Sequence, residues 1–236
     1  MALPKLNAVP KYELTLPSFK SPVKFRPFLV KEEKVLMIAA ESEDPRQMIG
    51  ALADIVENCI DADIDRSQMT STDVEYAFLK IRAKSVGENA NIGLTCPHCN
   101  AVNSVDVNVD EIETPKVSKL KDKIEVDKNI FIELQQPSFD AILETTTENS
   151  TAADSLLKIV CKCIVGIKTE DEYIKTADIS EKELIEFVES MDTKQFNLIR
   201  EFVEQLPRIQ HTVNYKCEKC GSDNEFTIEG IQSFLS

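Results

Sequence analysis

The sequence contains no tryptophan, only six glycines and only two histidines among its 236 residues. It has no GxGxxG and no GxxxxGK[ST] segment, which removes the common glycine-rich loops that bind dinucleotides and nucleoside triphosphates. HExxH and GxSxG segments are also lacking, so neither a zinc-protease helix nor a hydrolase nucleophile turn is present. Because His98 and His211 are the only imidazoles, few histidine general bases are available. These absences lead us to expect a protein that is not an enzyme.

The chain also lacks any apolar run that approaches the roughly 20 residues of a membrane-spanning helix. Its first residues, MALPKLNAVPKYEL, do not contain the continuous apolar core of a secretory signal. Basic residues are in the minority, since 27 lysines and arginines stand against 41 aspartates and glutamates and give a formal charge of −14. Nucleic acid and anionic membranes repel such a chain. We therefore expect a cytoplasmic protein without a membrane span, whose partners are proteins and not nucleic acid.

Seven cysteines are present, an odd number that does not suit a set of disulfides. Four of them form two CxxC pairs, TCPHCN over residues 95–100 and KCEKCG over residues 216–221. A CxxC turn presents two thiolates to one metal ion, and two such turns complete the tetrahedral sphere of zinc. The two pairs lie much further apart than the usual separation of about 15–20 residues, so a shared site needs independent support.

The sequences that flank the two pairs supply that support. An apolar residue precedes each pair by two positions, Leu94 and Tyr215, and an asparagine follows each pair by four, Asn103 and Asn224. Alternating apolar residues then continue at matching offsets. The two segments therefore predict two copies of one strand–turn–strand hairpin, which face each other as a zinc ribbon. The expected ligands of one structural Zn²⁺ are Cys96, Cys99, Cys217 and Cys220.

The long separation is compatible with a shared site because each doubling of a closed loop costs only about 0.6 kcal/mol. A sphere closed by four thiolates leaves no position for water or substrate, so the expected zinc is structural. Two separate sites, thiols without metal, and redox chemistry of the thioredoxin kind, for which a suitable βαβ context is lacking, are the alternatives. We expect His98 to be exposed and not a ligand. The remaining thiols, Cys59, Cys161 and Cys163, are expected to be buried as small apolar side chains.

The patterns together predict an α+β fold with four segments. Residues 1–90 are expected to form an N-terminal hairpin plus helices, and residues 91–116 the first zinc-ribbon hairpin. Residues 117–207 are expected to form a mainly helical insertion, with one strand over NIFIELQQ. Residues 208–236 contain the second hairpin and the C-terminus.

Residues typical of helix ends mark several helices within these segments. Asp44 and Pro45 predict the start of one helix, and Gly87 predicts the end of the next. Thr151 and Ser180 have the spacing of capping boxes at the starts of two helices in the insertion, the first over SLLKIVCKCIVGI and the second over LIEFVESM. Thr193 is the predicted cap of the last helix.

Longer stretches of the chain resemble a known family. PVKFRPFLVKEEKVLMIAAES over residues 22–42, DVEYAFLKIRAKSVGE over residues 73–88, and the two CxxC pairs together resemble a baseplate hub protein of T-even-type contractile-tailed bacteriophages. The resemblance covers nearly the whole chain. It implies a virus protein without enzymatic activity, made in the cytoplasm of the infected bacterium, that helps to build the tail baseplate hub through contacts with other hub or tail proteins. Both a resident of the mature particle and an assembly factor fit this description.

A short segment between prolines is the candidate partner-binding surface. It contains Phe25, Arg26, Phe28 and Leu29, and aromatic and arginine side chains are favoured anchors of protein interfaces. The alternative is that these residues cover the protein's own core. A rival function is a zinc-ribbon adaptor that binds the transcription machinery. The acidic residues around both CxxC pairs disfavour direct binding of nucleic acid in either case.

Overall fold

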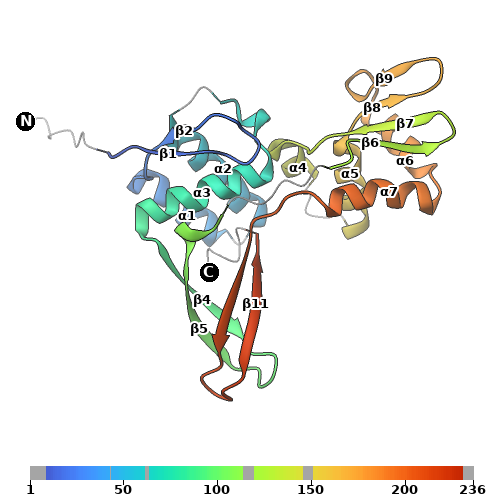
Figure 1. The fold of residues 1–236 in the computed structure, drawn as a ribbon. Coiled ribbons are helices and arrows are strands. Elements are labelled where there is room, and N and C mark those ends of the chain that lie inside the picture. Colours follow the sequence, from blue (N-terminus) through green and yellow to red (C-terminus); the bar gives the residue numbers. More distant parts are fainter. Residues whose placement is uncertain (1–8, 43, 62–63, 114–119, 146–150, 231–236) are drawn as a thin grey trace, which may run out of the picture. The chain divides into compact units, whose positions relative to one another are not determined.

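The computed structural model describes residues 9–42, 44–61, 64–113, 120–145 and 151–230 (Figure 1). The chain divides into two compact units. Unit 1 consists of residues 1–64, 72–115 and 208–236, and unit 2 of residues 65–71 and 116–207. Unit 2 is therefore inserted into the chain of unit 1. Among the described residues, no helix has both the length and the apolar character needed to cross a membrane.

The N-terminal part of unit 1 combines a small antiparallel sheet with three helices. The strands, in sheet order, are β1 (Tyr12–Leu14), β2 (Val23–Phe25) and β3 (Ile60–Asp61). The helices are α1 (Val30–Glu41), α2 (Pro45–Cys59) and α3 (Ser71–Val86). Buried apolar side chains along α3 form much of the core, namely Val74, Ala77, Phe78, Leu79, Ile81 and Ala83.

The predicted ends of two of these helices are confirmed. The Asp44 carboxylate accepts a hydrogen bond from the Arg46 N–H and caps α2, which begins at Pro45. Gly87 follows the last residue of α3 and has a φ of 126°, a conformation that side chains with a Cβ rarely adopt. Asp73 is fully buried, and its carboxylate accepts hydrogen bonds from the backbone and hydroxyl of Ser18. The start of α3 is thereby tied to the turn between β1 and β2.

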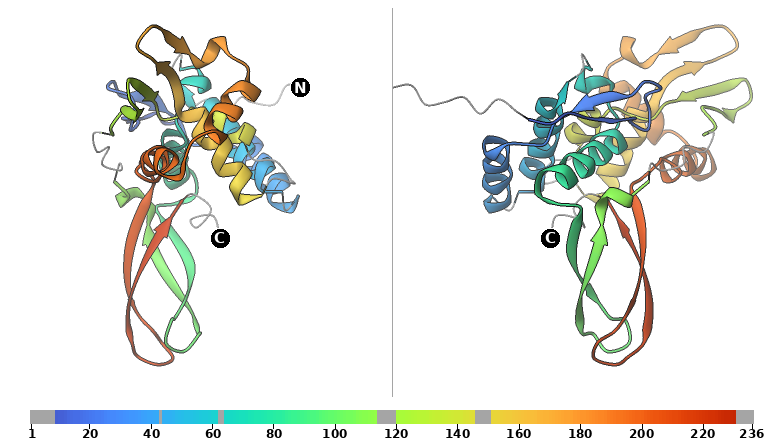
Figure 2. Two further views of the ribbon diagram at one scale, coloured as in Figure 1. Left: turned by 90° about the vertical axis from the view of Figure 1, so that its right-hand side faces the viewer. Right: turned by 60° about the vertical axis from the view of Figure 1, so that its left-hand side comes forward.

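Two hairpins complete unit 1. The first pairs β4 (Asn89–Thr95) with β5 (Val102–Asn108), and the second pairs β10 (Gln210–Lys216) with β11 (Asp223–Glu229). Their registers are equivalent, because the last pair before the turn is Thr95↔Val102 in one and Lys216↔Asp223 in the other. Figure 2 shows the two hairpins extending in the same direction, with both turns close together at the same end. The prediction of two copies of one hairpin is therefore confirmed.

Unit 2 combines a four-stranded antiparallel sheet with four helices. The strands, in sheet order, are β6 (Lys123–Asp127), β7 (Ile130–Leu134), β8 (Ile164–Lys168) and β9 (Tyr173–Lys175). The helices are α4 (Phe139–Thr145), α5 (Ala152–Cys163), α6 (Glu181–Glu189) and α7 (Thr193–Glu204). The described residues also form three single 3₁₀ turns, η1 (Arg66–Gln68), η2 (Val109–Glu111) and η3 (Thr176–Asp178).

The sheet of unit 2 is larger than the single strand that the sequence pattern predicts. The helix expected over SLLKIVCKCIVGI ends at Cys163, and Ile164 already has extended φ and ψ angles of −80° and 119°. β-Branched residues follow, and they favour a strand when a neighbouring strand such as β7 is available for pairing. At Gly166 a Cβ would overlap the ring of Tyr173 in β9, so glycine permits the close approach of this side chain.

The helix caps of unit 2 are confirmed in two cases and corrected in one. Thr151 and Ser180 form capping boxes with Asp154 and Glu183. Thr193 is not the cap of α7. The cap is Asp192, whose carboxylate accepts from the Gln195 N–H at 2.9 Å while its own N–H donates to the Gln195 side chain at 2.9 Å. The spacing D-x-x-Q satisfies two backbone donors reciprocally, which explains why the aspartate caps in place of the neighbouring threonine.

Candidate metal centre

The first CxxC pair lies in a tight turn between β4 and β5. The Cys96 N–H donates to the Ala101 carbonyl at 2.8 Å, and the Asn100 N–H donates to the Cys96 carbonyl at 2.9 Å. Asn100 has a φ of 58°, a left-handed conformation that asparagine tolerates better than most residues. These bonds hold Cys96 and Cys99 at the two sides of one turn.

The second pair repeats this turn between β10 and β11. The Cys217 N–H donates to the Ser222 carbonyl at 2.9 Å, and the Gly221 N–H donates to the Cys217 carbonyl at 2.8 Å. Gly221 has a φ of 74°, so it occupies the conformation that Asn100 has in the first turn. The same backbone geometry therefore presents Cys217 and Cys220.

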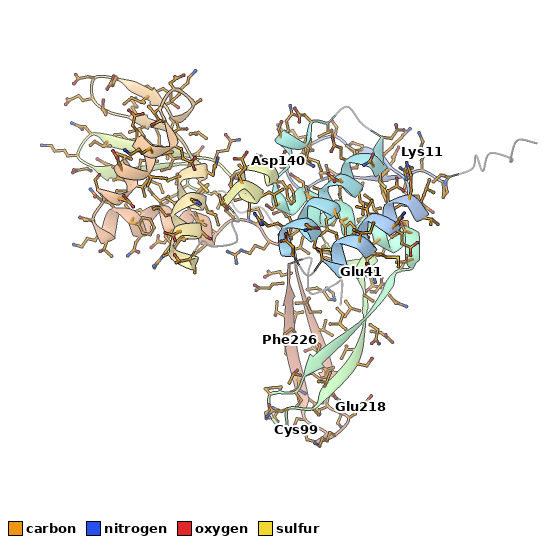
Figure 3. All side chains as sticks on the ribbon, turned by 180° about the vertical axis from the view of Figure 1, so that it is seen from behind. Lys11, Glu41, Cys99, Asp140, Glu218 and Phe226 are labelled. Carbon is orange, nitrogen blue, oxygen red and sulfur yellow. The ribbon has the colours of Figure 1, made fainter. Side chains whose placement is uncertain are left out.

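The structure brings together all four cysteines of the two pairs. Their sulfur atoms lie within 4.8 Å of one another, at the hairpin tips where Figure 3 labels Cys99. The sulfur of Cys96 is 3.7 Å from that of Cys220, and the sulfur of Cys99 is 3.6 Å from that of Cys217. A tetrahedral ion with metal–sulfur bonds of about 2.3 Å requires sulfur–sulfur separations of about 3.8 Å. Both distances also exceed a disulfide bond of about 2.05 Å, so these four free thiols fit a single metal ion.

Backbone amides around the cluster stabilise negative charge on some of its sulfurs. The N–H of Cys220, with a smaller contribution from that of Lys219, lowers the pKa of the Cys217 thiol to about 6. The Ser222 hydroxyl and N–H lower the pKa of the Cys220 thiol. At Cys99 the Ala101 N–H acts in the same direction, but desolvation and hydrogen bonds with the other three thiols raise the pKa to about 12. A bound divalent cation would favour the thiolate form of its cysteine ligands.

Two buried asparagines join the turns. The Asn103 side-chain oxygen accepts from the Glu218 N–H of the second turn at 2.9 Å, while its amide donates to the Ala101 carbonyl of its own turn at 3.0 Å. The Asn224 amide donates in the same way to the Ser222 carbonyl at 3.0 Å and lies 3.8 Å from the Cys96 sulfur. Their equal offset from the CxxC pairs was visible in the sequence. Their contacts with the opposite turn were not.

The other cysteines and His98 take no part in the cluster. His98 is exposed, as expected, and lies outside the group of potential ligands. Cys59, Cys161 and Cys163 are buried, which confirms their predicted role as apolar side chains. Desolvation raises the pKa of these thiols to about 11, 11 and 12 respectively, so they stay protonated at neutral pH.

Within the candidate partner-binding segment, Phe25 and Arg26 make internal contacts. Phe25 is 2% exposed, and its ring centroid lies 5.6 Å from that of Tyr12. The Arg26 guanidinium donates to Glu32 at 2.9 Å and to the Asn58 carbonyl at 3.0 Å. Both side chains contribute to the fold of unit 1.

Phe28 and Leu29 are the more accessible part of this segment. Phe28 is partly buried, and its N–H donates to the Ser85 hydroxyl at 2.9 Å. Leu29 is 42% exposed and directly precedes α1. Partner binding by this segment stays a prediction, and Leu29 is its most exposed large apolar side chain.

Comparisons with known proteins agree with the resemblance noted in the sequence. The family described as T4 bacteriophage base plate protein matches residues 9–236, which is nearly the whole chain. A search of curated proteins and a search of solved structures each gave no match. The chain therefore belongs to the T4 bacteriophage base plate protein family.

Proposed function

We propose that this chain is a structural or assembly protein of the phage tail baseplate hub, without enzymatic activity, and that a zinc ribbon with one structural Zn²⁺ holds its two hairpins together. The family match supports a role in the baseplate and contacts with other tail proteins. The residues from 22 to 42 and from 73 to 88 support the hub in particular. The protein would act in the cytoplasm of the infected bacterium during assembly, and in the tail baseplate if it stays in the particle.

The observation that carries the zinc proposal is the spacing of the four sulfurs. Four thiolates suit zinc or an iron–sulfur centre, and separations of 3.6 and 3.7 Å match the edges of a single tetrahedral ion. The ion would be held by Cys96, Cys99, Cys217 and Cys220. It would cross-link the two hairpins, and its four thiolate ligands would leave no coordination position open for water or substrate. The peptide N–H groups around Cys217 and Cys220 stabilise the thiolates that zinc requires.

Metal analysis of the purified chain tests the zinc site. We expect one equivalent of zinc in the wild type, loss of this zinc in Cys96→Ser, and one equivalent in the control His98→Ala, which changes an exposed residue of the same turn. Iron in place of zinc, or one full equivalent retained in Cys96→Ser, would contradict the proposal.

Affinity capture of the tagged chain from infected cells, followed by mass spectrometry, tests the hub role. We expect hub and other tail proteins to be recovered in stoichiometric amounts. Recovery of RNA polymerase without any tail protein would contradict the hub role and favour a transcription adaptor.

A further inference from the structure

Helix α1 exposes apolar side chains and buries a charged one. Val30 is 78% exposed, Met37 60% and Ile38 54%, whereas Glu32 is only 5% exposed. A surface helix normally has the opposite arrangement, with its apolar stripe towards the core. The solvent-facing side of α1 is therefore more apolar than is usual for a surface helix of a monomeric protein.

The buried Glu32 is explained by contacts within unit 1. Its carboxylate accepts from the Arg26 guanidinium at 2.9 Å and from the Leu29 N–H at 2.8 Å, so the charge is paired and the first turn of α1 is capped. These contacts account for the inner side of the helix. They do not account for the apolar residues on its outer side.

Along the outer side of α1, a basic residue, two apolar residues and an acidic residue follow one another. Residues separated by three, four or seven positions lie on one side of a helix, so Lys34, Met37, Ile38 and Glu41 form one stripe. A positive side chain precedes the apolar pair and a negative one follows it. Lys34 and Glu41 are both exposed, and neither forms an ion pair with another described residue (Glu41 is labelled in Figure 3).

When a second copy of this stripe runs antiparallel to the first, its negative end faces the positive end of the first, and the apolar pairs face each other. We infer that the outer side of α1 binds the same side of a second copy of this chain, with the two helices antiparallel. Met37 of each copy then packs on Ile38 of the other, and Lys34 of each copy faces Glu41 of the other. A two-fold axis between the helices repeats every contact, as in most homodimers. This inference does not depend on the hub role.

The size of the contact and the charge of the chain set the expected strength. A helix of 12 residues offers only about 18 Å of contact length, so the interface belongs to the small, transient class. Each copy also has a formal charge of −14, and the resulting repulsion is screened over about 8 Å at physiological salt. We therefore expect a monomer–dimer equilibrium with a dissociation constant on the order of 10–100 μM.

Sedimentation equilibrium of the full chain with two charge variants tests this inference. Lys34→Glu gives a stripe with two negative charges, and Glu41→Lys gives one with two positive charges. We expect the wild type to dimerise and each variant alone to lose at least ten-fold in affinity. An equimolar mixture of the two variants should form heterodimers, because every cross-pair is then between opposite charges. The double variant Lys34→Glu/Glu41→Lys should dimerise like the wild type.

Thermal melting of all variants controls for folding, and no large change is expected because both residues are exposed. A wild type that stays monomeric up to about 500 μM, well above the expected dissociation constant, would overturn the inference. Dimerisation that neither single variant weakens would place the contact elsewhere and overturn it as well. If the wild type stays monomeric but binds an identified hub protein, and Met37→Asp abolishes that binding, this side of α1 would bind the hub protein and not a second copy.

Discussion

Asn103 and Asn224 are buried beside the four cysteines, where each carboxamide braces the turn of its own hairpin. A carboxamide has both donors and an acceptor, so Asn103 bonds to one turn through its nitrogen and to the other through its oxygen. An aspartate would repel nearby thiolates, and a leucine would leave the backbone groups unpaired. Asparagine therefore suits a position between the two CxxC turns.

Replacement of Asn103 by alanine should destabilise the pairing of the two hairpins. The Glu218 N–H and the Ala101 carbonyl both lose a partner, which is expected to lower the free energy of unfolding by about 1–3 kcal/mol. Chemical denaturation of the metal-loaded protein measures this change. Asn91→Ala is the control, because Asn91 makes its hydrogen bonds on the exposed face of the same hairpin, and its effect should stay below about 1 kcal/mol.

Glu75 of α3 should make the stability of unit 1 depend on pH. Burial raises the pKa of Glu75 to about 7, although the charge of Arg208 acts in the opposite direction. The native state thus binds the proton more tightly than the unfolded state, where the pKa is about 4.3. This difference lowers stability as pH rises from about 4.3 to 7, and the loss is complete above that range.

Glu75→Gln removes this titration. Between pH 5 and pH 8 the wild type should lose about 2 kcal/mol more unfolding free energy than the variant, as measured by denaturant unfolding at both pH values. Glu33→Gln, which changes an exposed glutamate of α1, should show the same pH dependence as the wild type. Equal curves for the wild type and Glu75→Gln would show that Glu75 is ionised in the native state at pH 5.

The cysteine cluster could be predicted from the sequence because its geometry is largely local. CxxC spacing and the two matched flanks fix each turn, and only the meeting of the two turns depends on the rest of the fold. For Phe25 and Arg26 the sequence left both partner binding and a place in the protein's own core open. Their environment is created by Tyr12, Glu32 and Asn58, and no local pattern reports those contacts.

At the scale of single elements, two neighbouring residues have different roles at the start of α7. Asp192 accepts from the N–H groups of Lys194 and Gln195, whereas Thr193 is the first residue of the helix. Asp192→Ala should therefore lower stability by about 1 kcal/mol, and Thr193→Ala should change it by less than about 0.5 kcal/mol. Denaturant unfolding of both variants measures the difference, and a larger loss for Thr193→Ala would contradict the assignment of the cap.

Helix ends were easier to predict than the strands of unit 2, for a physical reason. A cap is determined by residues three positions apart, as in the boxes at Thr151 and Ser180. The short strands β6, β8 and β9 are stabilised by pairing across the sheet, so their residues alone do not specify them. The expected helix therefore extended too far, over residues that pair with β7.

At the scale of the molecule, each unit has its own core. Among the described residues, the apolar cluster of unit 2 has twelve buried side chains between residues 132 and 203, including Ile132, Val160, Ile164 and Ile199. The cysteine cluster belongs entirely to unit 1. Changes in the cluster should therefore affect the two cores differently.

Removal of the proposed metal tests this independence. Cys217→Ser should lower the melting temperature of unit 1 by roughly 10 °C or more, because structural zinc contributes several kcal/mol to folding. The transition of unit 2 should shift by less than about 2 °C. Differential scanning calorimetry, with hydrogen exchange to assign each transition, measures both. A single transition that shifts as a whole would show that the two units unfold together.

Residues 65–71 show what sequence patterns could not reveal about the division of the chain. They end at Ser71, the first residue of α3, but belong to unit 2. There the Phe139 N–H donates to the Met69 carbonyl at 2.7 Å, and Arg66 pairs with Asp140 at 2.9 Å. These contacts join segments about 70 residues apart. Sequence patterns assigned residues 65–71 to the N-terminal segment 1–90, because these residues carry no local signal of their contacts with Phe139 and Asp140.

The separation of the two hairpins has a consequence for synthesis of the protein. Cys96 and Cys220 are 124 residues apart, so a ribosome that adds about 5–20 residues per second needs roughly 6–25 s to make the second pair after the first. During that interval the growing chain has only two of the four thiols, and residues 116–207 of unit 2 are translated in between. Capture of the metal by all four thiols would therefore follow the synthesis of residues 116–207.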